Sequence, residues 1–162
     1  MTRPAYVVHT ASVPAIEAAY PPPFEAEKLS IGRDLGTAAG SVRLGVWHER
    51  LLPGRRSSFT HAHSDEEEAV YVLAGSPHLR VIPPGAAAEE HALGPGDFVS
   101  FPAGTGIAHC LVNHGPDEVT MLVIGERREG DRACYPDDGP FEAWHTAERP
   151  DRHWTDAPGH QK

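Results

Sequence analysis

The chain has 162 residues, which is enough for one ordinary hydrophobic core and too few for two. Apolar residues make up 40% of the sequence and charged residues 23%, a composition that excludes a disordered or collagen-like chain. The formal net charge is −9 and the 14 Lys and Arg residues are scattered, so neither nucleic acid nor an anionic membrane is expected as a partner.

The cysteine content and the hydrophobic pattern indicate the compartment. Two cysteines, Cys110 and Cys134, cannot form a disulfide framework, and residues 1–14 lack the apolar core of a secretory signal. No stretch approaches the ~18 apolar residues that a transmembrane helix needs. We therefore expect a soluble, cytoplasmic protein.

The first 40 residues are expected to form an irregular N-terminal arm. A short helix is predicted near residues 16–19, where the three consecutive prolines at 21–23 would end it. Residues 29–35 follow with only weak periodicity, so no regular element is assigned to them.

From Ser41 the pattern changes to alternation with a period of two, as Val42, Leu44 and Val46 show, until Pro53 and Gly54 end the run. Further strand-like runs, each bounded by Gly, Pro or Asn, are AVYVLAG, HLRVIP, EEHALG, DFVSFPA, HCLVN and EVTMLVIG. Many short strands without intervening helices predict an all-β sandwich or barrel over residues 41–126.

The remaining residues, 127–162, are polar and rich in proline but carry Tyr135, Phe141, Trp144 and Trp154. Large aromatic rings are seldom left fully exposed. We therefore expect this C-terminal tail to pack on the barrel or on a partner subunit.

A pair of histidines stands out in the segment FTHAHSDEEE. His61 and His63 are two residues apart, and side chains two apart on a strand point to the same face. Imidazole is the commonest protein ligand for a transition metal, so this pair predicts half of a metal site. Taken alone the pair also fits two solvent-exposed histidines, and the acidic residues after it fit a solvated turn.

The rest of the site needs a carboxylate and a remote ligand. Glu66, Glu67 and Glu68 all follow the histidine pair, and Glu68 is placed to open the next strand, with Val70 and Val72 on its face and Tyr71 and Leu73 on the other. The best remote candidate is His109, which alternation places on the same face as Leu111 and Asn113, with Cys110 opposite.

The spacing of these residues matches two sequence motifs that follow each other along the chain. Gly54, His61, His63, Glu68 and Gly75 follow the first motif of the cupin superfamily, with one extra residue between Gly54 and His61. That spacing selects Glu68 over its two neighbours.

The second cupin motif follows further along the chain. Gly96, Pro102, Gly104, His109 and Asn113 match it, with four residues in place of two between Gly104 and His109. An insertion of two residues preserves the alternation of a strand if it stays extended. The sequence therefore resembles the cupin superfamily, and in residues 101–115 it resembles stand-alone bacterial cupins.

This resemblance implies a cupin-type double-stranded β-helix, or jelly-roll barrel, that is often dimeric, with an irregular N-terminal arm and a C-terminal tail. It also implies one divalent metal ion, Fe, Mn, Ni or Zn, held by His61, His63, Glu68 and His109. A homodimer is further expected because the edge strands of such a barrel need cover.

Three His and one carboxylate leave coordination positions free for a ligand. We therefore expect a metal-dependent enzyme that acts on a small polar molecule by isomerase, lyase or oxygenase chemistry. The alternatives are a cupin that binds or senses a small ligand without turnover, and a barrel without metal. Outside the metal shell, His48 and Arg50 would face the pocket if the alternation of Val42 and Leu44 continued, and otherwise would lie at a solvated strand end.

Overall fold

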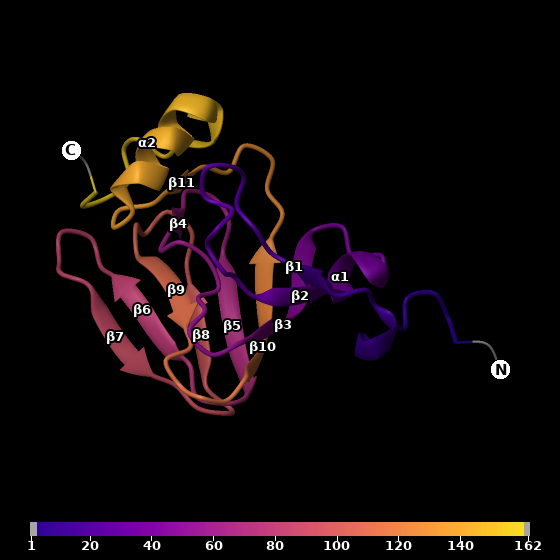
Figure 1. Ribbon diagram of the computed structural model, residues 1–162. Coiled ribbons are helices and arrows are strands. Elements are labelled where there is room, and N and C mark those ends of the chain that lie inside the picture. The colour runs from indigo at the N-terminus through magenta and orange to yellow at the C-terminus, as the bar shows by residue number, and fades with distance from the viewer. Residues whose placement is uncertain (1–2, 161–162) are drawn as a thin grey trace.

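A computed structural model of the chain describes residues 3–160. It is a two-layered β-barrel with a helix packed at one end, and the N-terminal segment extends away from the barrel (Figure 1). The strands are β1 (Ile16–Glu17), β2 (Ile31–Asp34), β3 (Leu44–Leu51), β4 (Ala62–His63), β5 (Glu68–Ala74), β6 (His78–Ile82), β7 (Glu89–Ala92), β8 (Phe98–Phe101), β9 (Ala108–Val112), β10 (Val119–Glu126) and β11 (Ala133–Cys134). The helices are α1 (Leu35–Ala38) and α2 (Gly139–Glu148), with 3-10 turns η1 (Thr10–Ser12) and η2 (Pro150–Arg152).

The described strands form a six-stranded sheet, in the order β1-β2-β3-β10-β5-β8, a three-stranded sheet, β7-β6-β9, and the short pair β11-β4. All the pairings between these strands are antiparallel. Neighbours in the sheets are far apart in sequence, as in β3-β10-β5, which is the crossed connectivity of a jelly roll and not of a meander. The predicted all-β jelly-roll fold is confirmed.

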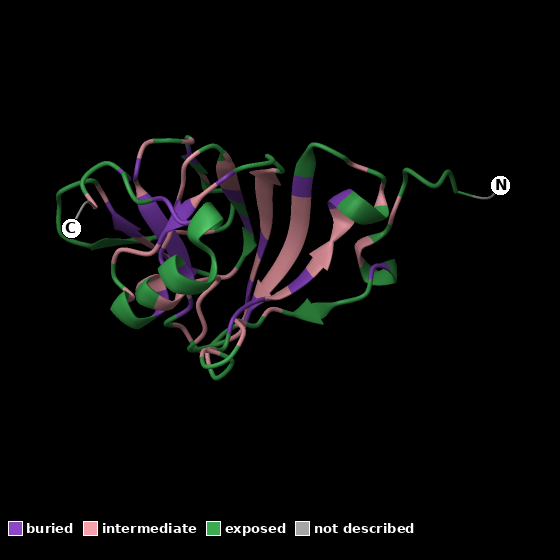
Figure 2. Ribbon diagram, turned by 90° about the horizontal axis from the view of Figure 1, so that it is seen from above, coloured by how far each residue is buried: buried purple, intermediate pink, exposed green. Residues whose placement is uncertain are grey.

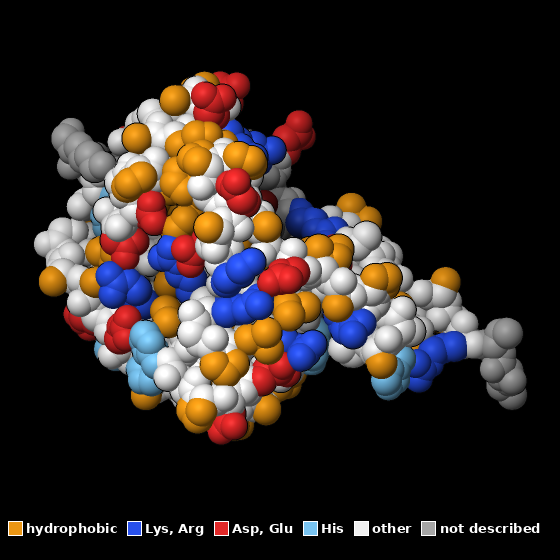
Figure 3. All heavy atoms as spheres, viewed as in Figure 1, with side chains coloured by type: hydrophobic (Ala, Val, Ile, Leu, Met, Phe, Trp, Pro, Cys, Tyr) orange, Lys and Arg blue, Asp and Glu red, His pale blue; other side chains and the backbone are white. Residues whose placement is uncertain are grey.

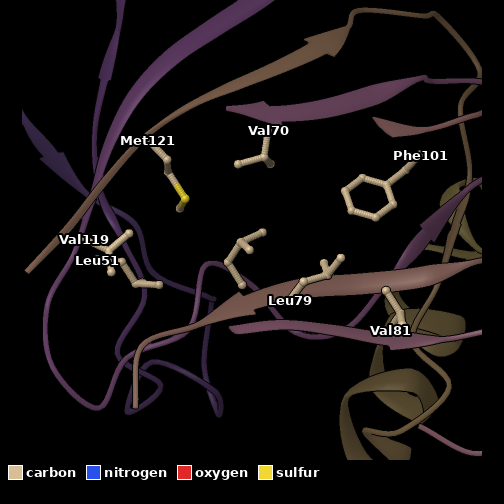
Figure 4. Close-up of a cluster of buried hydrophobic side chains, with 8 residues drawn as sticks. Leu51, Val70, Leu79, Val81, Phe101, Val119 and Met121 are labelled. Carbon is tan, nitrogen blue, oxygen red and sulfur yellow. The ribbon is translucent and has the colours of Figure 1, made fainter. Parts of the chain in front are cut away.

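Alternation along β5 and β9 places the predicted residues inside the barrel. Val70 and Val72 are 3% and 1% exposed, whereas Tyr71 and Leu73 on the opposite face are 38% and 41% exposed. His109, Leu111 and Asn113 are likewise buried. Leu111 belongs to one hydrophobic core with seven other buried residues. Figure 4 labels these seven, whose side chains point toward the space between the two sheets: Leu51, Val70, Leu79, Val81, Phe101, Val119 and Met121.

The N-terminal segment departs from the prediction. The helix expected at residues 16–19 is wrong, because β1 occupies residues 16–17 and pairs with β2. β2 in turn adds to the edge of β3, with Gly32 opposite Glu49. A strand this short is stabilised by its pairing partner and not by its own sequence, so no local pattern predicts it. Before β1 the chain is mostly exposed (Figure 2).

The C-terminal tail packs on the barrel. Asp138 caps the N-terminus of α2, where its carboxylate accepts a hydrogen bond of 3.0 Å from the amide of Phe141. Phe141 is 2% exposed, and its ring lies 4.5 Å from Phe59 and 4.7 Å from Tyr20, centroid to centroid. An ion pair of 2.9 Å between Asp137 and Arg80 of β6 adds a polar contact. The tail therefore closes one end of the barrel, as Figure 1 shows for α2.

The surface carries mixed charge. On the face seen in Figure 3, Lys and Arg side chains are interspersed with Asp and Glu and form no extended patch of one sign. Within residues 3–160, every helix is too short or too polar to cross a membrane.

Candidate metal centre

Backbone pairing brings the two halves of the predicted site together. The amide of His61 donates to the carbonyl of His109 at 3.1 Å, and the amide of His109 donates to the carbonyl of His61 at 2.8 Å. Residues that exchange both backbone hydrogen bonds lie directly opposite each other and project their side chains to the same face. His61 and His109, 48 positions apart in the sequence, therefore face one point, and their rings lie 5.1 Å apart.

Glu68 is the first residue of β5 and places its carboxylate among the histidines. Its Oε2 lies 3.0 Å from Nε2 of His109, 3.4 Å from Nε2 of His61 and 3.6 Å from Nε2 of His63. The ligand atoms of His61, His63 and Glu68 all lie within 4.8 Å of one another. The structure thus brings all four predicted residues together around one carboxylate oxygen.

Each imidazole is anchored through its other nitrogen. Nδ1 of His61 lies 2.9 Å from the carbonyl oxygen of Phe59, and Nδ1 of His109 lies 3.2 Å from that of Ile107. The ring of Phe101 stacks on His109 with 3.4 Å between centroids. All three Nε2 atoms face the Glu68 carboxylate, and a metal ion bound at this point would take the place of any proton on Nε2 while Nδ1 keeps its own.

The third imidazole is anchored by a residue that the sequence did not indicate. Asp131, in the segment that leads to β11, accepts from Nδ1 of His63 at 2.6 Å. Its other oxygen accepts from the backbone amides of Asp65 and Glu66 at 2.9 and 3.1 Å. These contacts span 65 to 68 positions, so no local pattern could have revealed Asp131.

The charges of the site match a cation. Burial alone would raise the pKa of Glu68, but hydrogen bonds from His109 and His61 and the neighbouring imidazoles hold that pKa well below its usual range. Burial lowers the pKa of His109, which keeps its imidazole neutral at pH 7. Burial lowers the pKa of His63, but the hydrogen bond to Asp131 and the charge of Glu68 outweigh it and raise that pKa, so a divalent cation that binds here would displace protons from the imidazoles.

Mixed imidazole and carboxylate ligands without thiolate fit Fe, Mn, Ni or Zn, and the anchored imidazoles add the outer hydrogen bonds typical of metal sites. Glu66 also lies within a ligand-sized distance of His63 and Asp131, but this second group shares His63 with the first. The first group comprises His61, His63 and Glu68, and His109 adjoins it through its contact of 3.0 Å with Glu68.

A small cavity adjoins these ligands inside the barrel. Its volume is about 120 Å³. Polar side chains that line it are Glu49, Ser57, Ser58, His61, Glu68 and His109, and the apolar part of its wall comprises Val70, Leu111 and Val123. A ligand in this cavity would therefore contact three of the four metal-site residues directly.

The pocket-facing residue of β3 is Glu49 and not His48 or Arg50. Arg50 points to the other face of the sheet, where its guanidinium makes a two-point contact of 2.6 and 2.8 Å with Glu118. The prediction assumed that Val42 and Leu44 lie on the inner face of β3, but both side chains are exposed, at 82% and 46%. Counting back from buried Leu51 would have placed Glu49 inside.

Replacement of Asp131 tests the anchoring of His63. In Asp131→Asn the amide nitrogen can face Nδ1 of His63, which removes the charged acceptor, and we expect the metal affinity to fall by about 10–100-fold. The affinity is measured by competition with a chromogenic chelator. Asp156→Asn, a change of the same kind at a carboxylate whose side chain is 72% exposed, is the control and should bind metal like the unmodified protein. Equal affinities in both variants would refute the anchoring role.

Comparisons with known proteins agree with this fold. The family model described as a cupin domain matches residues 47–125. A sugar phosphate isomerase of the cupin superfamily from Silicibacter pomeroyi is 33% identical, with 82% of each chain covered and a TM-score of 0.73. A protein from Acidithiobacillus ferrooxidans, provisionally described as a sugar phosphate isomerase, is 36% identical over 67% of this chain and 65% of its own, with a TM-score of 0.61.

A third solved structure covers nearly the whole chain. The polyketide cyclase RemF from Streptomyces resistomycificus is 25% identical over 95% of this chain and 99% of its own, with a TM-score of 0.63. No protein of the curated set matches the sequence. The match to the family model and the 33% identity over 82% of the chain lead to one conclusion: this chain is a member of the cupin superfamily.

Proposed function

We propose that the protein is a divalent-metal-dependent isomerase of a small hydroxycarbonyl compound, with the metal ion held by His61, His63, Glu68 and His109. The observation that carries this proposal is the convergence of four ligand-type side chains on one side of a polar cavity. A metal site with an accessible neighbouring cavity is typical of catalysis, whereas a structural site is closed by its protein ligands.

The relatives support isomerisation within the wider class of cupin chemistry. Two of the solved structures, 36% and 33% identical, bear the name of a sugar phosphate isomerase, the first of them provisionally. Aldose and ketose isomers differ only in the position of a carbonyl group and a hydroxyl group, so their interconversion needs no oxidant or reductant. This reaction suits a site that offers proton-transfer groups beside a cation.

The cavity limits the size of the reacting group. The volume of about 120 Å³ is smaller than the roughly 300–1,000 Å³ of typical small-molecule pockets, so the cavity admits a small group only. It therefore fits a three-carbon hydroxycarbonyl, or the reacting end of a longer molecule.

The chain's own residues have distinct tasks in this proposal. When bound, the metal ion would act as a Lewis acid that polarises a carbonyl group. The hydroxyl groups of Ser57 and Ser58 can hydrogen-bond to hydroxyl groups of the substrate, and Val70, Leu111 and Val123 exclude water from the reacting end.

The proposal is tested with protein that has been stripped of metal by a chelator and reloaded separately with Mn(II), Fe(II), Ni(II) or Zn(II). Three- to six-carbon hydroxycarbonyl compounds, with and without a phosphate group, are offered, and isomerisation is followed by NMR. We expect turnover only after reloading. Stoichiometric metal without turnover of any compound would contradict the proposal, and saturable binding in that case would indicate a cupin that binds its ligand without reaction.

A further inference from the structure

Glu49 is a half-buried carboxylate that the metal site does not use. It lies on β3 opposite Met121 of β10, in register, so both side chains project to the same face of the sheet. Met121 is fully buried, and Figure 4 shows it pointing into the space between the sheets. The side chain of Glu49 therefore enters the barrel, unlike its neighbour Arg50.

The cavities around Glu49 connect it to the metal site and to the outside. Glu49 lines the inner cavity together with His61, Glu68 and His109. It also lines a second cavity of about 490 Å³ over the N-terminal strands, which Ser30 and Trp47 border as well. A carboxyl group in this position can contact a substrate molecule bound beside the metal site and can exchange protons with water on its other side.

The surroundings of Glu49 contain no positive charge that would offset the partial withdrawal of its carboxylate from water. Ser30, which is 2% exposed, hydrogen-bonds to it, and the nearest charge that affects it is the negative one on Glu68. Within residues 3–160, Glu49 forms no ion pair with a Lys, Arg or His side chain. Burying an unpaired carboxylate is unfavourable, and such groups are found where function requires them.

We propose that Glu49 is the catalytic residue that takes a proton from the substrate carbon beside the carbonyl group and returns it to the neighbouring carbon. This inference rests on the proposed isomerase function. Glu49 of β3 and Glu68 of β5 lie in the same sheet with β10 between their strands, and both line the inner cavity, so a molecule bound at the metal site would be within reach of both carboxylates.

The proposed step balances without a co-reactant. The Glu49 carboxylate accepts the proton, the electron pair of the broken C–H bond forms a C=C bond, and the electron pair of the carbonyl π bond moves to its oxygen. Protonated Glu49 then donates to the former carbonyl carbon while a hydroxyl proton moves to the original oxygen. The substrate is isomerised, and Glu49 is restored as a carboxylate.

The electrostatic setting suits both directions of this transfer. Burial is the main cause that raises the pKa of Glu49 to about 7; the Ser30 hydrogen bond opposes it, and the nearby Glu68 charge adds a smaller increase. The charged or titratable groups that face the two cavities are Glu68 of β5, His61, His109 of β9 and Glu17 of β1, and β10 contributes only apolar Val123. A general base with a pKa near the working pH is the most effective one.

The experiment measures exchange of carbon-bound hydrogen in D₂O. Metal-loaded protein is incubated with dihydroxyacetone and, separately, with dihydroxyacetone phosphate, and the loss of the C–H signals is followed by ¹H NMR against a sample without protein. Glu49→Gln keeps the shape of the side chain and removes its basicity, so we expect exchange to slow by about 100-fold or more. Glu49→Asp, which keeps a carboxylate, should retain part of the rate.

Metal content and a control variant separate this role from a structural one. Glu49→Gln should bind as much metal and unfold at the same temperature as the unmodified protein. Glu118→Gln changes a carboxylate that lies just before β10 and pairs with the outward-facing Arg50, and it should leave the rate within about two-fold. Unchanged exchange in Glu49→Gln would overturn the role of Glu49 and leave the isomerase proposal intact, whereas no exchange by the unmodified protein would overturn both.

A second readout needs neither metal nor turnover. In metal-free protein labelled with ¹³C at the glutamate side-chain carboxyl, the signal missing from Glu49→Gln belongs to Glu49. We expect this signal to titrate with a midpoint of about 7. A midpoint near the usual glutamate value of 4.5 would contradict the proposed role.

Discussion

The double variant His61→Ala, His109→Ala is expected to lose its bound metal almost entirely. These two residues come from opposite strands of one antiparallel pair and supply two of the four proposed ligands. Loss of an outer hydrogen-bond partner already weakens metal binding by about 10–100-fold, and removal of two direct ligands must cost more. Metal content after dialysis is measured by atomic emission and affinity by calorimetric titration.

The matched control removes two other histidines. His78 and His114 also lie close together, with ring centroids 5.0 Å apart, and His114 contacts Glu90 at 3.0 Å on the surface. His78→Ala, His114→Ala therefore changes the same number of imidazoles outside the proposed site and should keep its metal. If both double variants retained equal amounts of metal, the four-residue site would be wrong, and only the cupin barrel would remain.

Phe141→Ala is expected to reduce the free energy of unfolding by about 3–5 kcal/mol. The ring is 2% exposed and lies at the centre of an aromatic cluster that joins α2 to the barrel and to the N-terminal segment. Its neighbours, all with ring centroids within 5.4 Å, are Tyr20, Phe24, Phe59, Tyr135 and Trp144. Removing it leaves a cavity that five rigid rings cannot readily fill, and a loss of this size is a large part of the stability of an ordinary domain.

Equilibrium unfolding in urea, followed by tryptophan fluorescence, measures this loss. Phe98→Ala makes the same chemical change at a ring on β8 that is 59% exposed, and we expect it to cost less than about 1 kcal/mol. A similar, small change in both variants would show that the tail contributes little to the folded state.

The sequence by itself determined those features that depend on alternation along one strand and on motif spacing. It placed Glu68, Val70 and Val72 on one face of β5, because a strand turns successive side chains to opposite faces. It likewise placed His109 and Leu111 of β9 on one face, together with Asn113 just after the strand. The same rule predicted that His61 and His63 point together. Motif spacing selected Glu68 from three adjacent glutamates, and the structure places Glu68 among the histidines.

The tertiary structure alone decided which face of β3 is the inner one and which distant residue supports His63. An alternating pattern does not say which of the two faces of a strand is buried. The prediction took Val42 and Leu44 to mark the inner face, but both are exposed, and the pairing of β3 with β10 is what places Glu49 inside. Asp131 reaches His63 across 68 positions, and β1 exists only because β2 pairs with it. A local pattern records the preferences of one segment, whereas these features arise from contacts between segments that meet only in the folded chain.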